Sequence, residues 1–165
     1  MGALCASCGL CCDGSIYDNV GLSSEETEFA AALGLNVQNL PHGSCFDQPC
    51  PHSGPSGCAI HHLPRPRVCG DFNCGVITRI ESGAQSLEEA AAHIATAKSL
   101  IALVRTRFLP GETMGDARMR WAAQTGDRAG PADPILSLAM AALTRHLDRH
   151  FRFGNQAMIR PAGKG

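Results

Sequence analysis

The stretch CASCGLCC, residues 5–12, places four of the chain's nine cysteines within eight residues. Cys5, Cys8 and Cys11 form two overlapping Cys-x-x-Cys units, and Cys12 closes them as a cysteine doublet. Two thiols supplied from one tight turn form half of a tetrahedral zinc site, and three thiols at this spacing also hold iron–sulfur clusters. Gly9 allows the backbone to turn closely here. The spacing therefore predicts a metal site and leaves zinc and iron open.

The doublet of Cys11 and Cys12 bears on the number of metal centres. Neighbouring side chains of extended backbone point to opposite sides, so two adjacent thiols readily serve two centres. The downstream cysteines bring the total to eight thiols, enough for two four-ligand centres or one polynuclear centre. These thiols belong to Cys50, Cys58, Cys69 and Cys74. The sequence does not assign each thiol to a centre.

The cellular compartment decides how so many thiols are interpreted. The N-terminal residues lack a basic segment followed by an apolar run of about 7–15 residues, as a secretory signal would have. No run approaches the roughly 18–20 apolar residues of a membrane span. We therefore expect a cytoplasmic protein, in which dense cysteines favour metal binding or catalysis over disulfides. A precursor whose signal had been removed would reopen the disulfide interpretation.

The charge balance restricts the partners. Lys and Arg number 14 against 15 Asp and Glu, a net charge of −1. No overall field draws the chain to nucleic acid or an anionic membrane. A basic helix face is predicted at Arg145, His146, Arg149, His150 and Arg152, but Asp148 interrupts it, which favours a solvated face. Metal ions are the expected partners, no membrane partner is expected, and no protein partner is predicted.

Composition divides the chain near residue 80. All cysteines lie between Cys5 and Cys74, among most of the prolines, whereas the remainder is rich in Ala, Leu and Arg. We expect a cysteine-rich metal-binding domain over residues 1–80 and a helical region over 81–165 with a frayed tail. The fold class is a small α-rich protein whose irregular, metal-stabilised loops pack on a C-terminal helical bundle.

Capping patterns and apolar spacing predict the helices. Ser23 with Glu26 starts one helix that Gly34 ends, and Ser86 with Glu89 starts another that Pro110 stops. Further helices are expected over residues 116–126 and 134–151, and a β-branched run predicts a short strand over 75–82. Stretch 41–75 has no period of 2 or 3.6, so metal cross-links are expected to order it. Expected core positions include Leu87, Ala91, Ile94, Ala95, Ala97, Leu100, Ile101, Val104, Met114, Met119, Trp121, Ile135, Leu138, Ala139, Met140, Ala142, Leu143 and Leu147.

The order of the cysteines is similar to that of the YkgJ-type cysteine-cluster family, the zinc- or iron-chelating domain named for its CxxCxxCC motif. The matching residues are Cys5, Cys8, Gly9, Cys11 and Cys12, then Cys50 with Pro51, Cys58 with Ile60, and Arg65, Pro66, Cys69, Phe72 and Cys74. His61 stands where the family usually has Tyr, and Gly70 where it often has Arg. The resemblance covers residues 5–75 and implies chelation of zinc or iron, including an iron–sulfur cluster, by the eight matched cysteines.

Other residues near the cysteines have alternative interpretations. Arg65 is expected beside the metal ligands, because four thiolates around a divalent ion sum to a charge of about −2 that a nearby cation offsets. Cys45 can be a spare ligand, a reactive thiol or a small buried hydrophobe, and the last of these interpretations is favoured. His52, His61 and His62 can each replace a thiolate, but a histidine in a loop is more often exposed or a donor to the backbone.

The sequence predicts a metal-binding protein with zinc or iron, and two other functions stay open. One is an iron-dependent or iron–sulfur oxidoreductase acting on a small molecule or a peptide, and the other is a zinc-stabilised interaction module. An open coordination position favours chemistry, whereas closed four-thiolate sites favour a structural role. The chain has no nucleophile elbow, phosphate loop or dinucleotide fingerprint.

Overall fold

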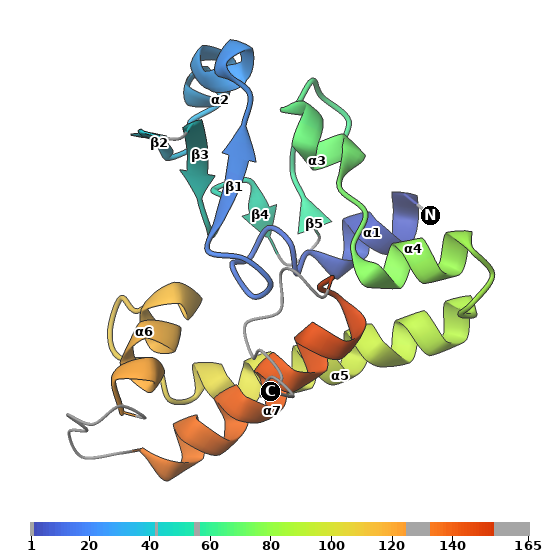
Figure 1. Cartoon of the computed structure of the whole chain (residues 1–165), viewed down its shortest axis with the longest axis vertical. Helices are drawn as coiled ribbons and strands as arrows, with labels where there is room; N and C mark the ends of the chain where they lie inside the picture. Colours follow the sequence, from blue (N-terminus) through green and yellow to red (C-terminus); the bar gives the residue numbers. More distant parts are fainter. Residues whose placement is uncertain (1, 42, 55–56, 125–132, 154–165) are drawn as a thin grey trace, which may run out of the picture. The chain divides into compact units, whose positions relative to one another are not determined.

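A computed structural model describes residues 2–41, 43–54, 57–124 and 133–153 of the chain (Figure 1). By its contacts the chain divides into two compact units, residues 1–72 and residues 73–165. Seven α-helices and two small sheets form the described part, so the prediction of a mostly α protein is confirmed. The boundary lies between Phe72 and Asn73, whereas composition suggested a change near residue 80. Cys74 therefore belongs to the second unit.

The first unit combines short helices with two antiparallel sheets. Its elements are α1 (Gly2–Cys8), β1 (Asn19–Leu22), the 3-10 helix η1 (Ser24–Glu26), α2 (Thr27–Ala32), β2 (Val37–Leu40), β3 (Gly43–Asp47), β4 (Ser53–Gly54), β5 (Gly57–Cys58) and α3 (Arg67–Asp71). One sheet has the order β1-β3-β2, with Cys45 of β3 opposite Gly21 on one side and Gln38 on the other. Strands β4 and β5 form a hairpin.

A small apolar core supports this sheet. Phe46 of β3 is 2% exposed and packs with Ala30 of α2 and Leu35. Partly buried residues that pack against this core include Cys50 and Val68. Stretch 41–75 is therefore ordered in part by hydrophobic burial, which its lack of periodicity did not predict.

The predicted helix after residue 23 is present as η1 followed by α2. The Ser23 N–H and hydroxyl both donate to Glu26 Oε2, at 3.4 and 2.7 Å. Gly34, with φ of +78°, lies just beyond the helix, as expected for a left-handed C-terminal residue. The second oxygen of Glu26 accepts a hydrogen bond from the Arg67 N–H at the start of α3. Glu26 therefore takes part in the cap at Ser23 and also binds the start of α3.

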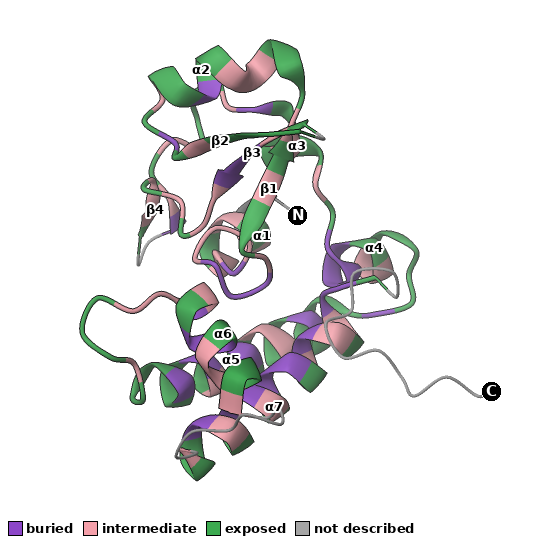
Figure 2. Cartoon of the chain, turned by 60° about the vertical axis from the view of Figure 1, so that its left-hand side comes forward, coloured by how far each residue is buried: buried purple, intermediate pink, exposed green. Residues whose placement is uncertain are grey.

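The second unit contains four helices: α4 (Gly75–Glu81), α5 (Leu87–Arg105), α6 (Met114–Gln124) and α7 (Pro134–His150). Helices α5 and α7 lie side by side (Figure 1) and bury apolar residues from both (Figure 2). The fully buried positions include Ala97, Val104, Leu136, Leu143 and Leu147. The predicted capping box of α5 is confirmed, because Ser86 N–H donates to Glu89 at 2.7 Å and Glu89 N–H donates to the Ser86 hydroxyl at 3.1 Å.

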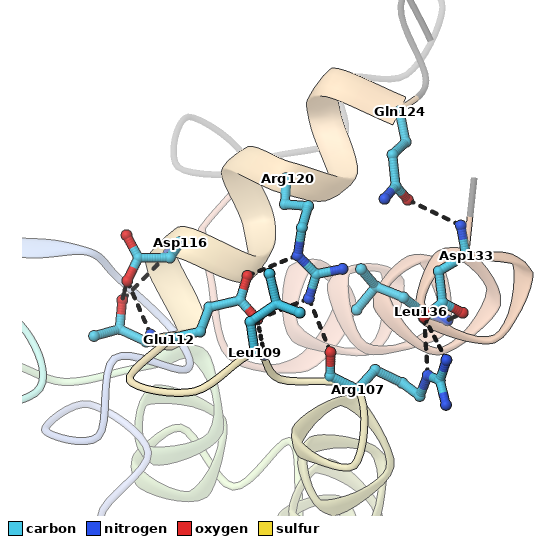
Figure 3. A network of polar contacts seen from close by, with 9 residues as sticks. Arg107, Leu109, Glu112, Asp116, Arg120, Gln124, Asp133 and Leu136 are labelled. Carbon is cyan, nitrogen blue, oxygen red and sulfur yellow. Dashed lines mark hydrogen bonds and ion pairs between the residues drawn. The ribbon is translucent and has the colours of Figure 1, made fainter. Parts of the chain in front are cut away.

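A polar network holds α6 to the loop before it (Figure 3). Arg120 donates two hydrogen bonds to the Glu112 carboxylate, each of 2.7 Å, and a third to the Arg107 carbonyl at 2.9 Å. The Arg107 side chain in turn pairs with Asp133 at 2.8 Å, and Asp133 caps the first turn of α7. The network therefore connects α6 to the start of α7.

Several sequence-based expectations in the second unit are wrong. The predicted strand over residues 75–82 is helix α4, which buries Val76 and Ile77 on one face. Helix α5 ends at Arg105, ahead of Pro110, because Thr106 closes its last turn. Seven residues assigned to the core are exposed: Leu87 at 60%, Met119 at 67%, Ile135 at 51% and Leu138 at 75%, together with Ala91, Ala95 and Ala142.

The predicted helices over 116–126 and 134–151 are present as α6 and α7, but Gly126, the expected end of α6, lies outside the described residues. The expected frayed tail, residues 160–165, lies outside them as well. Within the described ranges, none of the helices has the length and apolar character needed to cross a membrane.

Candidate metal centre

The N-terminal cysteines lie on a helix and the turn that follows it, where the sequence suggested a loop. Cys5 and Cys8 are in α1, three residues apart, and Gly9 ends the helix with φ of +72°. The N–H groups of Cys12 and Asp13 then donate to the Gly9 carbonyl, at 2.9 and 3.1 Å. The cysteine doublet is thus held in a hydrogen-bonded turn, so the argument from extended backbone does not apply to it.

Two close backbone contacts bring distant cysteines to this turn. The Cys50 N–H donates to the Cys12 carbonyl at 2.8 Å. Gly57, beside Cys58 in β5, is buried against α1, and a Cβ built on it would lie 1.9 Å from the Ala6 carbonyl oxygen. Only glycine allows this approach, which places the Cys58 segment against the helix that carries Cys5 and Cys8.

The thiol of Cys12 has the most perturbed environment. Burial is the first cause that raises its pKa, to about 12, and negative charge on Cys50, Cys58, Cys69 and Cys5 raises it further, in that order of effect. Thiols from four separate segments of the first unit therefore gather around Cys12. A cluster of this kind stays protonated at neutral pH unless a cation compensates the charge of the thiolates.

Four of these thiols act on one another in every pairing. Burial, then Cys50, raises the pKa of Cys69, and Cys58 raises it too. Burial also raises the pKa of Cys50, and Cys58 adds to this effect. Cys50, Cys58 and Cys69 also each raise the pKa of Cys12. An electrostatic interaction therefore links every pair among Cys12, Cys50, Cys58 and Cys69. We call these four residues the four-thiol set. Cys5 also raises the pKa of Cys12, but it is the last of the causes and is not included in the set.

Hydrogen-bond donors and a cation already oppose the negative charge of the set. The backbone N–H groups of His52 and Ser53 lower the pKa of Cys50 by donating to its sulfur, against the larger effect of burial. The Arg65 guanidinium likewise lowers the pKa of Cys69, although burial of the thiol is the larger effect. Such donors and cations stabilise metal-bound thiolates. Arg65 is therefore close enough to act on Cys69, and its expected role in offsetting the charge of metal-bound thiolates stays a prediction.

The remaining predicted residues are placed as follows. Cys8 and Cys11 are half-buried in the N-terminal segment, and Cys74 precedes α4 in the second unit. Cys45 is buried in β3, as expected for a small hydrophobe. His52 is a backbone donor, with Nε2 at 2.7 Å from the Leu33 carbonyl. His61 and His62 are exposed. All nine cysteines lie in the described ranges, and none forms a disulfide.

The four-thiol set consists of ligands that zinc and iron both accept. Four thiols in one neighbourhood fit the chemistry of both ions, which take thiolate ligands in tetrahedral sites. Their side-chain positions are not those of a closed site, because no three histidine, cysteine, aspartate or glutamate residues of the described ranges are arranged to hold a metal ion. Metal binding therefore requires these side chains to adopt other positions.

Some contributors to the site have no clear signal in the sequence. Glu26, a helix-capping residue, is close enough for its charge to raise the pKa of Cys69. It also lines a pocket of about 330 Å³ with Asp71 and Phe72 beside α3. The need for glycine at position 57 is likewise invisible until β5 is seen against α1.

A scan against protein-family models, a search of curated proteins and a search of solved structures each found no match. The resemblance to the YkgJ-type family therefore depends only on the matched cysteines and the residues beside them.

Proposed function

We propose that the protein binds zinc or iron through the thiolates of Cys12, Cys50, Cys58 and Cys69. The observation that carries this proposal is that every pair among these four thiols interacts electrostatically. Four thiolates satisfy a tetrahedral ion without a fifth protein ligand. A divalent cation also offsets the burial and the mutual repulsion that raise the pKa values of Cys12, Cys50 and Cys69.

The surroundings of the set support thiolate ligation. Two backbone N–H groups reach the Cys50 sulfur, and the Arg65 guanidinium acts on Cys69. Cys5, Cys8 and Cys11 are outside the four-thiol set, and we assign them to the second centre that the eight cysteines predict. In this assignment Cys12 belongs to the downstream cysteines and Cys11 to the N-terminal ones.

The test is the metal content of protein purified without oxygen, by elemental analysis and an ultraviolet–visible spectrum. Strong visible absorption indicates thiolate-bound iron, and a colourless protein with stoichiometric zinc indicates a zinc site. The variants Cys12→Ser and Cys58→Ser are expected to lose at least one ion per chain. The matched control is Cys45→Ala, which removes a buried thiol outside the set.

Two results contradict the proposal. One is wild-type protein that neither contains nor takes up zinc or ferrous iron. The other is a metal content of Cys58→Ser equal to that of Cys45→Ala. Titration with Co²⁺ gives an independent readout, because charge-transfer absorption from thiolate to cobalt should weaken in Cys12→Ser and stay unchanged in Cys45→Ala.

A further inference from the structure

Three imidazoles form a compact cluster in the second unit, well separated in sequence from the cysteines. His93 of α5 stacks on His150 of α7, with ring centroids 3.8 Å apart and planes at 24°. His146, one turn earlier on α7, lies 4.7 Å from His150 and 5.8 Å from His93 between ring centroids. All three residues are half-buried, and His146 Nε2 donates to the His93 carbonyl at 3.0 Å.

Helix α4 is attached to α7 at the same place. Arg79 of α4 donates from its guanidinium to the His150 carbonyl, and the Gly75 N–H donates to the Phe151 carbonyl at 2.8 Å. A Cβ on Gly75 would lie 2.9 Å from the His150 carbonyl oxygen, so the two backbones are in close contact. The end of α7 thus carries both the stacked histidine and the two hydrogen bonds that hold α4.

We propose that the three-histidine cluster is an acid-sensitive lock that holds α4 and α5 to the C-terminal end of α7. Neutral imidazoles stack and hydrogen-bond without charge. Protonation places imidazolium ions 3.8 Å apart and beside the Arg79 guanidinium, where like charges repel strongly because water is partly excluded. The cluster is treated as a proton site, since no three histidine, cysteine or acidic residues of the described ranges are arranged to hold a metal ion.

The charged groups around the cluster favour its neutral form. Arg79 acts on His93 and His150 from α4, and Arg149 acts on both from α7. Glu89, on α5 one turn before His93, acts against these cations by raising the pKa of His93. Its carboxylate also accepts the hydrogen bond from the Ser86 N–H that caps α5. Burial first, then His93, His146 and the two arginines, lowers the pKa of His150 to about 4. Burial and the same cations also lower the pKa of His93.

The direction of the pH effect follows from these lowered pKa values. The unfolded chain, with histidines near their ordinary pKa of 6.5, binds more protons than the folded unit between pH 6.5 and about 4. The stabilisation that the cluster gives to the attachment of α4 and α5 is therefore complete above pH 6.5, and it weakens as the pH falls towards 4. Because the rings are partly solvated, we expect about a tenfold rise in the opening equilibrium between pH 7 and pH 5.

The experiment is hydrogen exchange of the full-length protein, resolved by peptide, at several pH values and corrected for the intrinsic exchange rate. Amides of α4 and of the last turns of α7 should lose protection about tenfold between pH 7 and pH 5. In His150→Gln this loss should be largely abolished, because the glutamine does not titrate. His62→Gln is the control, since it removes an exposed histidine of the first unit.

The thiols also titrate, so wild type and variant are compared at each pH and only the difference between them is interpreted. If His150→Gln fails to fold, His93→Gln replaces it. Imidazole NMR titration of the wild type is an independent measurement, in which His150 should titrate well below 6.5. The proposal is wrong if the three imidazoles all titrate near 6.5. It is equally wrong if neither variant changes the pH dependence of exchange in α4 and α7.

Discussion

Gly57 lies against Ala6 so closely that a Cβ at residue 57 would be 1.9 Å from the Ala6 carbonyl oxygen. The atom in the way belongs to the backbone of α1, so no side chain can move aside. Gly57 also has φ of +99°, a conformation that other residues rarely adopt. This contact joins β5, which ends at Cys58, to the helix that carries Cys5 and Cys8.

The variant Gly57→Ala is expected to separate β5 from α1. The clash and the strained backbone together should lower the free energy of unfolding by about 3 kcal/mol and reduce the zinc or iron content. Gly54→Ala, in the paired strand, is the matched control, because its Cβ would meet its nearest atom at an ordinary 3.8 Å. Denaturant unfolding and elemental analysis measure both effects. Equal stability of the two variants would show that the close contact is not required.

Arg65 is predicted to strengthen metal binding through its charge. Its guanidinium lowers the pKa of Cys69, so Arg65→Gln should weaken zinc affinity about tenfold, as replacing groups that surround metal ligands often does. Arg65→Lys keeps the charge and should lose less. The control is Arg67→Gln, whose side chain is 80% exposed in wild type. Competition with a chromophoric chelator measures the affinities, and equal affinity of Arg65→Gln and Arg67→Gln would contradict the prediction.

Zinc binding should release protons. The pKa values of Cys12, Cys50 and Cys69 are raised, chiefly by burial, so these thiols are protonated at neutral pH in the metal-free protein. Each must lose its proton to become a ligand, so about three or more protons should leave per ion at pH 7. Affinity should consequently rise with pH towards these raised pKa values. Calorimetry in buffers of different ionisation enthalpy counts the protons, and a count of one or fewer would exclude ligation by all three.

The Arg120–Glu112 pair is expected to stabilise the second unit measurably. The Glu112 side chain is 6% exposed and accepts two hydrogen bonds from Arg120, so Glu112→Gln should cost about 2 kcal/mol. The comparison is Asp71→Asn, which breaks a pair whose side chains are 80% and 69% exposed and should cost at most about 0.5 kcal/mol. Thermal and urea unfolding measure both.

This stabilisation has a defined pH dependence. Hydrogen bonds from Arg120 are the first cause that lowers the pKa of Glu112 below its ordinary value of 4.5. The contribution is therefore present above pH 4.5 and is lost as the pH falls through the lowered pKa. The stability difference between wild type and Glu112→Gln should shrink in acid. A difference that stays constant down to low pH would indicate that the carboxylate charge is not its source.

Features that depend on local sequence were predicted well. The two capping boxes, Ser23 with Glu26 and Ser86 with Glu89, are present because their hydrogen bonds span only three residues. Gly9 and Gly34 follow helices with the positive φ that glycine favours. The division of the doublet between two centres and the ligation of metal by Cys12, Cys50, Cys58 and Cys69 both stay predictions.

Features that depend on tertiary packing were missed. The β-branched residues at positions 76 and 77 favoured a strand, but burying them on one face of α4 outweighs that preference. Strands β1, β2 and β3 have only four or five residues each, and of the three only β1 alternates in burial, so pairing around Phe46 defines them. On α7 the apolar residues extend around the helix, and Leu138 faces outward at 75% exposure.

Successive members of the four-thiol set are separated by very unequal numbers of residues along the chain. Cys50 and Cys58 are eight residues apart, Cys58 and Cys69 eleven, and Cys12 and Cys50 thirty-eight. Closing the longest of these loops in a flexible chain costs about 1.4 kcal/mol more than closing the shortest, because the entropy lost grows with the logarithm of loop length. During folding an ion should therefore be captured first between Cys50 and Cys58 and then by Cys69. The N-terminal segment, through Cys12, would complete the coordination last.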